Sequence, residues 1–472
     1  MKKIILVFLG CMVAILLHAQ TAYDFMVPNS DGIRLYYKIT DTSKGYVMLT
    51  TADGEVNPQI TDKYGSQMTN LGIDTFNVPA TVMYGGNQYS IKMIASYVGQ
   101  SLAGGEWKIV FPEGLTTLKT YSLTYLSGFK SIYFPSTLET VGGSSFTDIS
   151  SYSLSEVTLD LSRTKVTTLI DAFGGMNDAI SKIIFPETLT SLGLIGLIGL
   201  KELTLPAAVN SLAYSSLMNL EILRIKNATP PTTASSGLSF PKIKKIFVPA
   251  DAATAYSQAE KWSNFAGKYY GEVTIGASGY ATYYLVNDNF EVPAGCTAYV
   301  ITEVKKESGQ YQAKTEAFAA GSIIPAGQAV ILKGAAGQTY EYKANLTGTP
   351  VTIAKNLLVG TAIEQTLNAA GYKYFLFGSG PDGQGFYRQT GHDINSIHLK
   401  AHKAGLRLPS TAIGSAKSFV IDFSTPETTG IRSVGSAVQP SKEDVYFDLQ
   451  GRRVLHPTRG IYIVNGKKVV KE

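Results

Sequence analysis

The sequence predicts a mainly β protein with short helices, built from a solenoid of stacked strand units, a β-sandwich-like domain and a small C-terminal β module. Three observations support this fold class. A six-residue strand pattern recurs within residues 100–271, and alternating apolar segments with Gly and Pro turns follow it. Only 16% of the 472 residues are charged, while 28 are Tyr and 46 are Gly, a balance that favours β structure over long charged helices.

Residues 1–20 have the pattern of an export signal peptide. Two lysines precede an apolar run from Ile4 to Leu17, which is shorter than the roughly 20 residues of a membrane-spanning helix, and the small residue Ala19 follows. We expect cleavage after Ala19 or Gln20, a chain exported to the cell surface or the extracellular space, and no transmembrane segment in the mature chain. A lipoprotein signal is the alternative, because Leu9-Gly10-Cys11 loosely resembles a lipobox.

The charge and the cysteine content of the sequence bear on its binding partners and on its disulfide bonds. The net charge of +5 is small and scattered, so we expect no nucleic-acid partner. Cys11 and Cys296 are the two cysteines of the sequence, so a mature chain that has lost Cys11 forms no internal disulfide. Its stability must come from packing.

The strand pattern consists of an apolar residue, two others, an apolar residue, one other and an apolar residue. It recurs every 20 to 26 residues, beginning at Phe129, Leu154, Ile180, Leu200, Leu220 and Ile243, and a degraded copy occupies residues 106–111. Proline, which lacks an N–H group and suits the end of a strand, follows five copies at Pro112, Pro135, Pro186, Pro206 and Pro249. Each unit buries its apolar side only by stacking on its neighbours, as in a solenoid.

These repeats resemble leucine-rich repeats, and their details are similar to the BspA-like subfamily of Bacteroidetes surface proteins. The resemblance rests on VPATVMYGGNQYSI at 78–91, on the FPxxLxxL form at 111–118 and 185–192, and on NATPPT at 227–232 followed by IFVPADAATAYSQAEKWSNF at 246–265. It implies an N-terminal β segment and cap at 21–99 and a leucine-rich-repeat solenoid with a C-terminal capping helix at 100–271. Leu161-Ser162 and Lys226 depart from the family, which has Pro there.

The exit segment contains residues suited to closing the solenoid. We expect Asp251 to cap a short helix, whose Tyr256, Trp262 and Phe265 cover the open end of the repeat core. An exposed sugar-stacking platform is the alternative for these three aromatic residues.

Three further segments follow the solenoid. Residues 272–423 form the β-sandwich-like domain, whose GYATYY, IPAGQAVILKG and GFYR stretches resemble a domain that often follows such repeats and that implies no activity. Residues 424–443, rich in Ser, Thr and Pro, are expected to be a linker. Residues 444–472 resemble short C-terminal modules of secreted Bacteroidetes proteins, whose longer relatives are type IX secretion sorting signals; the resemblance is carried by Asp448, Leu449, Gly451, Arg452, Arg453, Gly460, Tyr462 and residues 467–470. A β extension docked on the preceding domain is the alternative.

Catalytic and metal-binding motifs are weak. The sequence contains neither GxSxG nor HExxH, and the GxGxxG match at 378–383 lies between strand-like segments with no helix after it, which indicates a hairpin loop. His392, His398 and His402 fall close together, but Asp393 is the one carboxylate near them, so we interpret them as surface histidines without a ligand role. Cys296 is expected to be a buried structural thiol. We therefore expect no catalytic residue, no metal and no cofactor.

The exposed side of the repeat strands carries the candidate binding site. Side chains alternate along a strand, so the residues between the apolar positions point away from the interior and form a concave ladder face. The expected ligand-binding residues there are Tyr133, Thr158, Lys182, Ile184, Glu202, Thr204, Arg224, Lys245 and Phe247. Tyr133, Arg224 and Phe247 belong to types enriched at interface hot spots. A solvated face, or a face covered by the chain itself, is the alternative.

The function that follows is adhesin-like recognition of a protein or glycan ligand, host molecules included, without catalysis. One alternative is a carbohydrate-active enzyme with its site in residues 272–423, where Glu303, Glu316 and Asp382 are the candidate acids. The other alternative is a structural surface-layer component.

Overall fold

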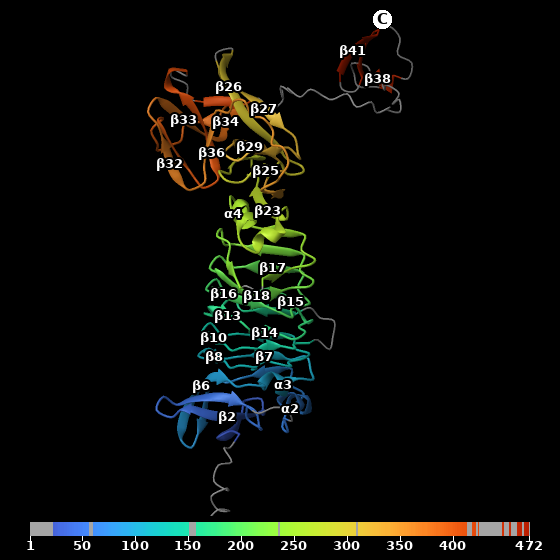
Figure 1. Cartoon of the computed structure of the whole chain (residues 1–472), viewed down its shortest axis with the longest axis vertical. Coiled ribbons are helices and arrows are strands. Elements are labelled where there is room, and N and C mark those ends of the chain that lie inside the picture. The colour runs from blue at the N-terminus through green and yellow to red at the C-terminus, as the bar shows by residue number, and fades with distance from the viewer. Residues whose placement is uncertain are drawn as a thin grey trace, which may run out of the picture. The chain divides into compact units, whose positions relative to one another are not determined.

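The computed structural model describes residues 22–55, 60–150, 157–234, 237–307, 310–412, 418–421 and 423, and four C-terminal strands. The predicted signal peptide and linker lie outside the described residues. The chain forms two compact units, Met1–Glu427 and Thr428–Glu472. Figure 1 confirms the predicted fold class, a mainly β chain with short helices in which a solenoid of stacked turns is followed by further β structure. Within the described residues, no helix is long and apolar enough to cross a membrane.

The N-terminal part of the first unit is a small sheet that continues into the solenoid. Its elements are β1 (Phe25–Pro28), β2 (Arg34–Asp41), β3 (Tyr46–Thr50), α2 (Tyr64–Leu71), β4 (Thr75–Asn77), β5 (Thr81–Tyr84), β6 (Asn87–Ile94) and α3 (Val98–Leu102). Strand β6 pairs in parallel with β3 on one side. On its other side it pairs in parallel with β8 (Thr117–Leu118), the first short strand of one side of the solenoid. The sheet therefore closes the N-terminal end of the repeat core. Between α3 and the first repeat strand, the buried Trp107 donates its indole N–H to the carbonyl of Leu102 at 2.8 Å.

The predicted repeat strands lie along one side of the solenoid as three successive runs of parallel strands, here together called the ladder. After β4 the ladder contains β7 (Lys108–Val110), β9 (Ser131–Tyr133), β12 (Val157–Asp160), β15 (Ile180–Ile184), β17 (Glu202–Leu205), β19 (Ile222–Ile225), β22 (Lys245–Phe247) and β23 (Tyr269–Thr274). Every motif position predicted to be apolar and included in the described residues is buried, from Ile109 to Val248. Burial of these side chains is the main stabilising contribution of the stack.

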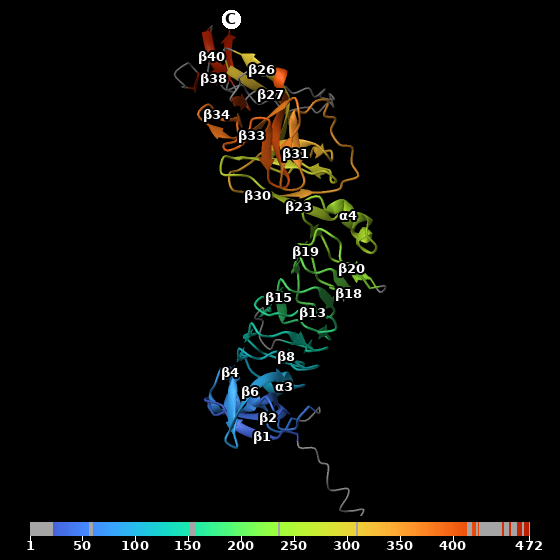
Figure 2. The ribbon, with the colours of Figure 1, turned by 90° about the vertical axis from the view of Figure 1, so that its left-hand side faces the viewer.

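Two further strand rows build the other sides of the solenoid, and Figure 2 shows β15 and β19 on one side with β13, β18 and β20 on the other. One row is β8 (Thr117–Leu118), β10 (Thr140–Val141), β13 (Thr168–Leu169), β16 (Ser191–Leu194), β18 (Ser211–Ser216) and β20 (Thr232–Thr233). The shorter row is β11 (Phe146–Thr147), β14 (Phe173–Gly174) and β21 (Leu238–Ser239), which pairs with the end of β18.

The repeat prolines open the turns that follow the ladder strands; four of these turns lead to the second row, and the turn at Pro249 leads to the capping helix at 253–258. The carbonyl of each accepts a hydrogen bond from the N–H group three residues later, at distances of 3.1 or 3.2 Å, in Pro112, Pro135, Pro186, Pro206 and Pro249. Leu161 makes the same turn without proline, because its carbonyl accepts from Thr164 N at 3.0 Å. After Lys226 the side chain of Asn227 makes the turn by accepting from Thr229 N at 2.9 Å. Both departures from the family pattern thus retain a turn.

The exit segment closes the solenoid with α4 (Ala253–Gln258) and the 3-10 helix η1 (Trp262–Phe265). Tyr256, Trp262 and Phe265 are buried, so they form the predicted capping core and not an exposed sugar platform. The predicted role of Asp251 is wrong: its carboxylate accepts from Val286 N of the following domain at 3.0 Å and not from the first turn of α4. The first N–H groups of α4 are capped instead by Asp288, from the following domain.

The following β region belongs to the same compact unit as the solenoid. Strand β23 extends the ladder in parallel with β22 and then pairs antiparallel with β30 (Thr339–Lys343). A nine-stranded sheet has the order β24 (Tyr280–Tyr284), β29 (Ala329–Lys333), β26 (Thr297–Glu307), β27 (Gln310–Phe318), β37 (Ser418–Ile421), β34 (Gly383–Tyr387), β33 (Tyr372–Gly380), β36 (Lys403–Pro409) and β31 (Leu358–Thr361). The small pairs are β25 (Phe290–Glu291) with β28 (Ile323–Ile324) and β32 (Gln365–Asn368) with β35 (Ser396–Leu399); η2 spans Ser410–Ala412.

The GxGxxG stretch is the β33–β34 hairpin, as predicted, because Gly380 pairs with Gly383 across it. Cys296 is buried, also as predicted, and burial raises the pKa of its thiol.

The second unit is an antiparallel sheet in the order β39 (Arg453–Val454), β38 (Tyr446–Phe447), β40 (Gly460–Val464) and β41 (Lys467–Lys471). The short strand β39 lies between β38 and β40 in the sequence. Val464 and Lys467 are the last pair between β40 and β41, and residues 465–466 between them lie outside the described residues.

Candidate ligand-binding face of the solenoid

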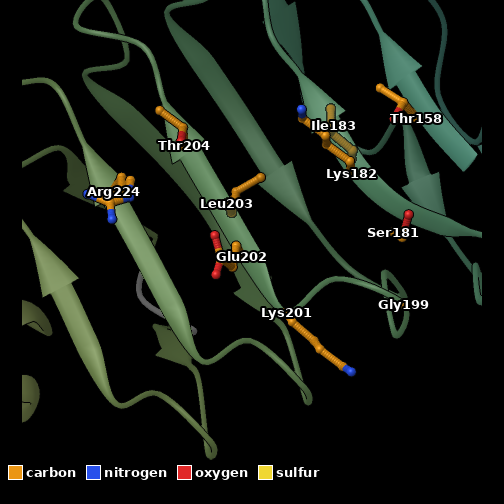
Figure 3. A pocket seen from close by; sticks show the side chains of 10 residues that line it. All are labelled: Thr158, Ser181, Lys182, Ile183, Gly199, Lys201, Glu202, Leu203, Thr204 and Arg224. Carbon is orange, nitrogen blue, oxygen red and sulfur yellow. The ribbon is translucent and has the colours of Figure 1, made fainter. Parts of the chain in front are cut away.

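A groove of about 470 Å³ lies on the ladder face where the sheet is interrupted. Strands β12 and β15 form one sheet and β17, β19 and β22 another, and the groove spans this break. We call it the ladder groove; it is lined by Thr158, Ser181, Lys182, Ile183, Gly199, Lys201, Glu202, Leu203, Thr204 and Arg224 (Figure 3). It brings together five of the nine predicted ligand-binding residues.

Two local features of the sequence shape this break. The pairing of β12 with β15 shifts register between Val157 and Thr158, so that Ser181 is left without an opposite residue. Such bulges re-aim side chains and disturb the neighbouring ladder. Gly199, at the start of the next turn, lies so close to the backbone that a Cβ atom there would be 2.6 Å from the carbonyl oxygens of Asp178 and Ile180. Glycine is therefore required for this close approach.

Three of the four charged side chains that line the ladder groove are free to meet a ligand, and the fourth, Arg224, is paired with Glu272. Lys182, Lys201 and Glu202 are exposed, and none of them has a carboxylate or ammonium partner within 4.0 Å in the described part of the chain. Thr158 and Thr204, also exposed, add two hydroxyl groups. The groove thus offers charges of both signs and hydrogen-bonding groups on a rigid sheet.

Ile184 is half-buried and lines a smaller hollow of about 250 Å³ beside the ladder groove. Lys182 and Thr204 line both hollows, so the two adjoin each other. Lys226 and Glu187 form an ion pair of 2.7 Å at the edge of the smaller hollow.

The end of the ladder nearest the β domain is occupied by the chain's own side chains. Phe247 was predicted to be an exposed anchor, and this is wrong because its side chain is only 4% exposed. The guanidinium of Arg224 lies 4.0 Å above the Phe247 ring and donates to Glu272 at 2.8 Å. The ring of Tyr270 packs against Phe247 at 5.8 Å. Strand β23 therefore supplies the residues that cover this anchor.

Lys245 also contacts residues of the strands that follow the solenoid. Its ammonium group lies 2.5 Å from Glu341 of β30 and 5.4 Å from the centre of the Tyr270 ring. Arg224 and Lys245 therefore hold the solenoid ladder to the strands that follow it, and are less free for a ligand than Lys182 and Glu202.

Tyr133 lies towards the other end of the ladder and is 38% exposed. Arg163 packs its guanidinium 5.0 Å from the ring centre and donates to the hydroxyl oxygen at 2.7 Å. The hydroxyl group in turn donates to Glu113 at 3.4 Å. The ring is thus held in place with part of its surface open to solvent.

The histidines that were singled out do not converge. His392 and His398 stack with their ring centres 6.0 Å apart, whereas His402 lies 3.5 Å from Asp251 at the solenoid cap. Among the described residues there is no group of three or more His, Cys, Asp or Glu side chains that could hold a metal ion.

The three acids of the glycosidase alternative lie on separate elements, with Glu303 in β26, Glu316 in β27 and Asp382 in the β33–β34 turn. A hydrogen bond from Lys305 lowers the pKa of Glu303. A general acid needs the opposite shift, so Glu303 does not suit that role.

Sequence reasoning missed Ser181, Gly199 and Lys201 as groove residues. Ser181 and Lys201 occupy the second position of the repeat motif, which faces solvent at the start of each strand, so the position alone could have identified them. Gly199 carries no such signal, because its role depends on contact with the preceding turn.

Comparison with known proteins concerns the solenoid. Residues 106–224 match the family model of the BspA type leucine rich repeat region, in six copies. No curated protein matches this chain. A solved leucine-rich repeat protein from Bacteroides ovatus is 14% identical, with 49% of this chain and 75% of that chain covered and a TM-score of 0.19.

Two more solved structures are similar over the same share of this chain. A leucine rich cell surface protein from Faecalibacterium prausnitzii is 12% identical, with 48% of this chain and 71% of that chain covered and a TM-score of 0.27. The pneumococcal vaccine antigen PcpA is 13% identical, with 48% and 88% covered and a TM-score of 0.17. On the strength of the family match, residues 106–224 form leucine-rich repeats that are similar to those of the BspA type.

Proposed function

We propose that this chain is an exported cell-surface or secreted protein that recognises a protein or glycan ligand through its ladder face, without catalysing a reaction. The observation that carries the proposal is the ladder groove, in which Lys182, Lys201 and Glu202 have no ion-pair partner in the described residues. Leucine-rich-repeat solenoids use this kind of extended surface for binding. A rigid sheet also lowers the conformational entropy lost on association.

Ladder residues that already contact the β domain are excluded from the proposed binding site. Arg224, Lys245 and Phe247 are engaged with Glu272, Glu341 and Tyr270, so they hold the junction of the solenoid with the β domain. The proposed contact residues are therefore Thr158, Lys182, Ile184, Glu202 and Thr204, with Tyr133 at the edge. Charges of both signs favour a ligand that itself presents an acidic and a basic group, as a folded protein does.

A charge swap tests this proposal. Printed glycans and immobilised extracellular-matrix proteins serve as probes for the wild-type chain and for the double variant Lys182→Glu/Glu202→Lys, which keeps the net charge. We expect the variant to bind the wild type's probe at least tenfold more weakly, a loss of about 1.4 kcal/mol, because each charge of the ligand now faces its own sign.

The matched control is Glu139→Lys/Lys165→Glu, in which the same two residue types are swapped at exposed positions off the ladder strands. This control should bind like the wild type. Unchanged binding by the groove variant would place recognition outside the ladder groove.

We also propose that residues 444–472 serve export or surface attachment, as their resemblance implies. Their sheet belongs to a compact unit distinct from residues 1–427. Deleting residues 424–472 should leave the thermal unfolding of the purified remainder unchanged and should remove the protein from the cell surface, measured by protease shaving of intact cells. Normal surface amounts of the truncated chain would contradict the sorting role.

A further inference from the structure

A cavity lies in the β domain where its nine-stranded sheet comes back upon itself. The first strand of the sheet, β24, lies beside β36: Tyr284 N donates to the carbonyl of His402 at 3.2 Å, and Ala404 N donates to the hydroxyl of Thr282 at 3.1 Å. These two strands, both within the described residues, are not paired as neighbours in the sheet, so a seam remains. Beside it lies a cavity of about 440 Å³, here called the seam pocket, lined among others by Ser278, Tyr280, Phe377, Gln389, Lys400 and Lys403.

One side of the seam pocket is aromatic and fixed in place. The rings of Tyr280 and Phe377 lie edge to face with their centres 5.9 Å apart, and Phe423 stacks on Tyr280 at 4.5 Å. Phe423 covers one face of Tyr280, and the Lys333 ammonium lies 5.8 Å from the centre of the same ring. Tyr280 and Phe377 are half-buried and line the cavity, so part of each ring is accessible from it. Ser278 and Thr282 add hydroxyl groups.

The other feature of the seam pocket is its pair of lysines, Lys400 and Lys403. Lys400 is exposed and Lys403 is half-buried, and within the described residues neither ammonium group has a carboxylate within 4.0 Å. Glu364, in the loop before β32, is engaged by the imidazole of His398 at 3.1 Å. Burial, and then the neighbouring Lys400 cation, lower the pKa of Lys403. Both lysines line the same cavity, and two cations there without a carboxylate partner create a favourable place for an anion.

We propose that the seam pocket binds an acidic sugar, a hexuronate or sialic acid residue, whose carboxylate is held by Lys400 and Lys403 and whose ring lies against Tyr280. A pyranose has an apolar face that packs on an aromatic ring and hydroxyl groups that reach Ser278 and Thr282. The cavity volume lies within the usual range of small-molecule pockets, about 300 to 1,000 Å³. The pocket opens to solvent, whereas a fatty acid, the other ligand with an acid and an apolar part, requires an enclosed apolar tunnel.

The test uses the full-length protein with free glucuronate and N-acetylneuraminate in titration calorimetry, and with glucose and inorganic phosphate as comparison ligands. At least one acidic sugar should bind, and Lys400→Met and Lys403→Met should each weaken that binding at least tenfold. Glucose should bind at least tenfold more weakly than the acidic sugar. Lys355→Met, an exposed lysine outside the pocket, is the matched control and should leave binding unchanged.

Because Lys403 is half-buried, thermal unfolding of each variant is measured as well, and the exposed Lys400 carries the test if Lys403→Met unfolds. Absence of acidic-sugar binding, or binding that both lysine variants retain, would overturn the proposal. Equal lysine-dependent affinity for phosphate and for the acidic sugars would also overturn it, because it would reveal an anion site that does not recognise the sugar ring.

Discussion

Asp251 in the solenoid cap and Asp288 in the β domain each accept hydrogen bonds from backbone N–H groups on the other side of the junction between these two parts. The carboxylate of Asp251 accepts from the backbone N–H groups of Val286 and Asn287 at 3.0 and 2.9 Å. The buried carboxylate of Asp288 accepts from Ala253 and Thr254, at the start of α4, at 2.9 and 2.8 Å. Each domain thus satisfies backbone donors of the other, and burial raises the pKa of Asp288 despite these bonds.

The first prediction concerns the cap that Asp288 provides. Asp288→Ala leaves two backbone donors of α4 without an acceptor, so the free energy of unfolding should fall by about 1 to 2 kcal/mol in denaturant titrations. Hydrogen exchange of the Ala253 and Thr254 amides should accelerate. Asn287→Ala is the control, since the exposed Asn287 contributes its backbone N–H to this junction. If both variants unfold at the same denaturant concentration as wild type, the cap does not stabilise the junction.

At the scale of elements, the turns of the solenoid are held by close backbone contacts as well as by apolar side chains. The chain enters β17 through Gly199, which packs against the carbonyls of Asp178 and Ile180 in the preceding turn. This packing sets the spacing of β15 and β17, between which the ladder groove lies. The groove therefore depends on one residue without a side chain.

The second prediction follows from that contact. Gly199→Ala places a Cβ atom 2.6 Å from two carbonyl oxygens, so a strand or turn must shift. We expect a loss of about 1 to 3 kcal/mol in the free energy of unfolding, measured by denaturant titration. Gly378→Ala is the matched control, because a Cβ atom there meets nothing within 4 Å. Equal stability of the two variants would show that the turn adapts without loss.

At the scale of the whole molecule, tyrosines make a large part of the buried core. Burial raises the pKa of several phenols, namely Tyr37, Tyr64, Tyr256, Tyr269, Tyr283 and Tyr342. Burial, and then its hydrogen bond with Asp62, raise the pKa of Tyr36 to about 12. These residues come from the N-terminal sheet and its helix α2, the solenoid cap and the β domain, so the parts on either side of the repeats share this property.

The third prediction concerns alkaline pH. Unfolded tyrosines lose their protons near pH 10, whereas the folded chain keeps the protons of these buried tyrosines, with Tyr36 protonated up to about 12. The folded state therefore binds more protons in this interval, and its stability must fall as the pH rises above about 10. Denaturant titrations at increasing pH, with tyrosinate absorbance as the second readout, should show both changes together. Ionisation of all tyrosines while the chain remains folded would contradict the prediction.

Sequence by itself was enough for the repeat architecture. The six-residue motif, its period and the prolines that follow it identify β7, β9, β12, β15, β17, β19 and β22, because strand alternation and stacking are local and periodic properties. The capping aromatic residues were also predictable, since large apolar side chains at the end of an open core have to be covered. The burial of Cys296 follows from the general preference of a free thiol for the interior.

The tertiary structure alone decided which ladder residues remain free and which residues join the domains. Arg224 and Glu272 are 48 residues apart, and Lys245 and Glu341 are 96 apart, so no local pattern indicates that they pair. The same holds for the hydrogen bonds of Asp251 and Asp288 across the junction and for the separation of His402 from His398. The burial of Phe247 also depends on chain segments that meet only after folding. Local periodicity determines which face a side chain takes, whereas its partners are determined by how distant segments pack.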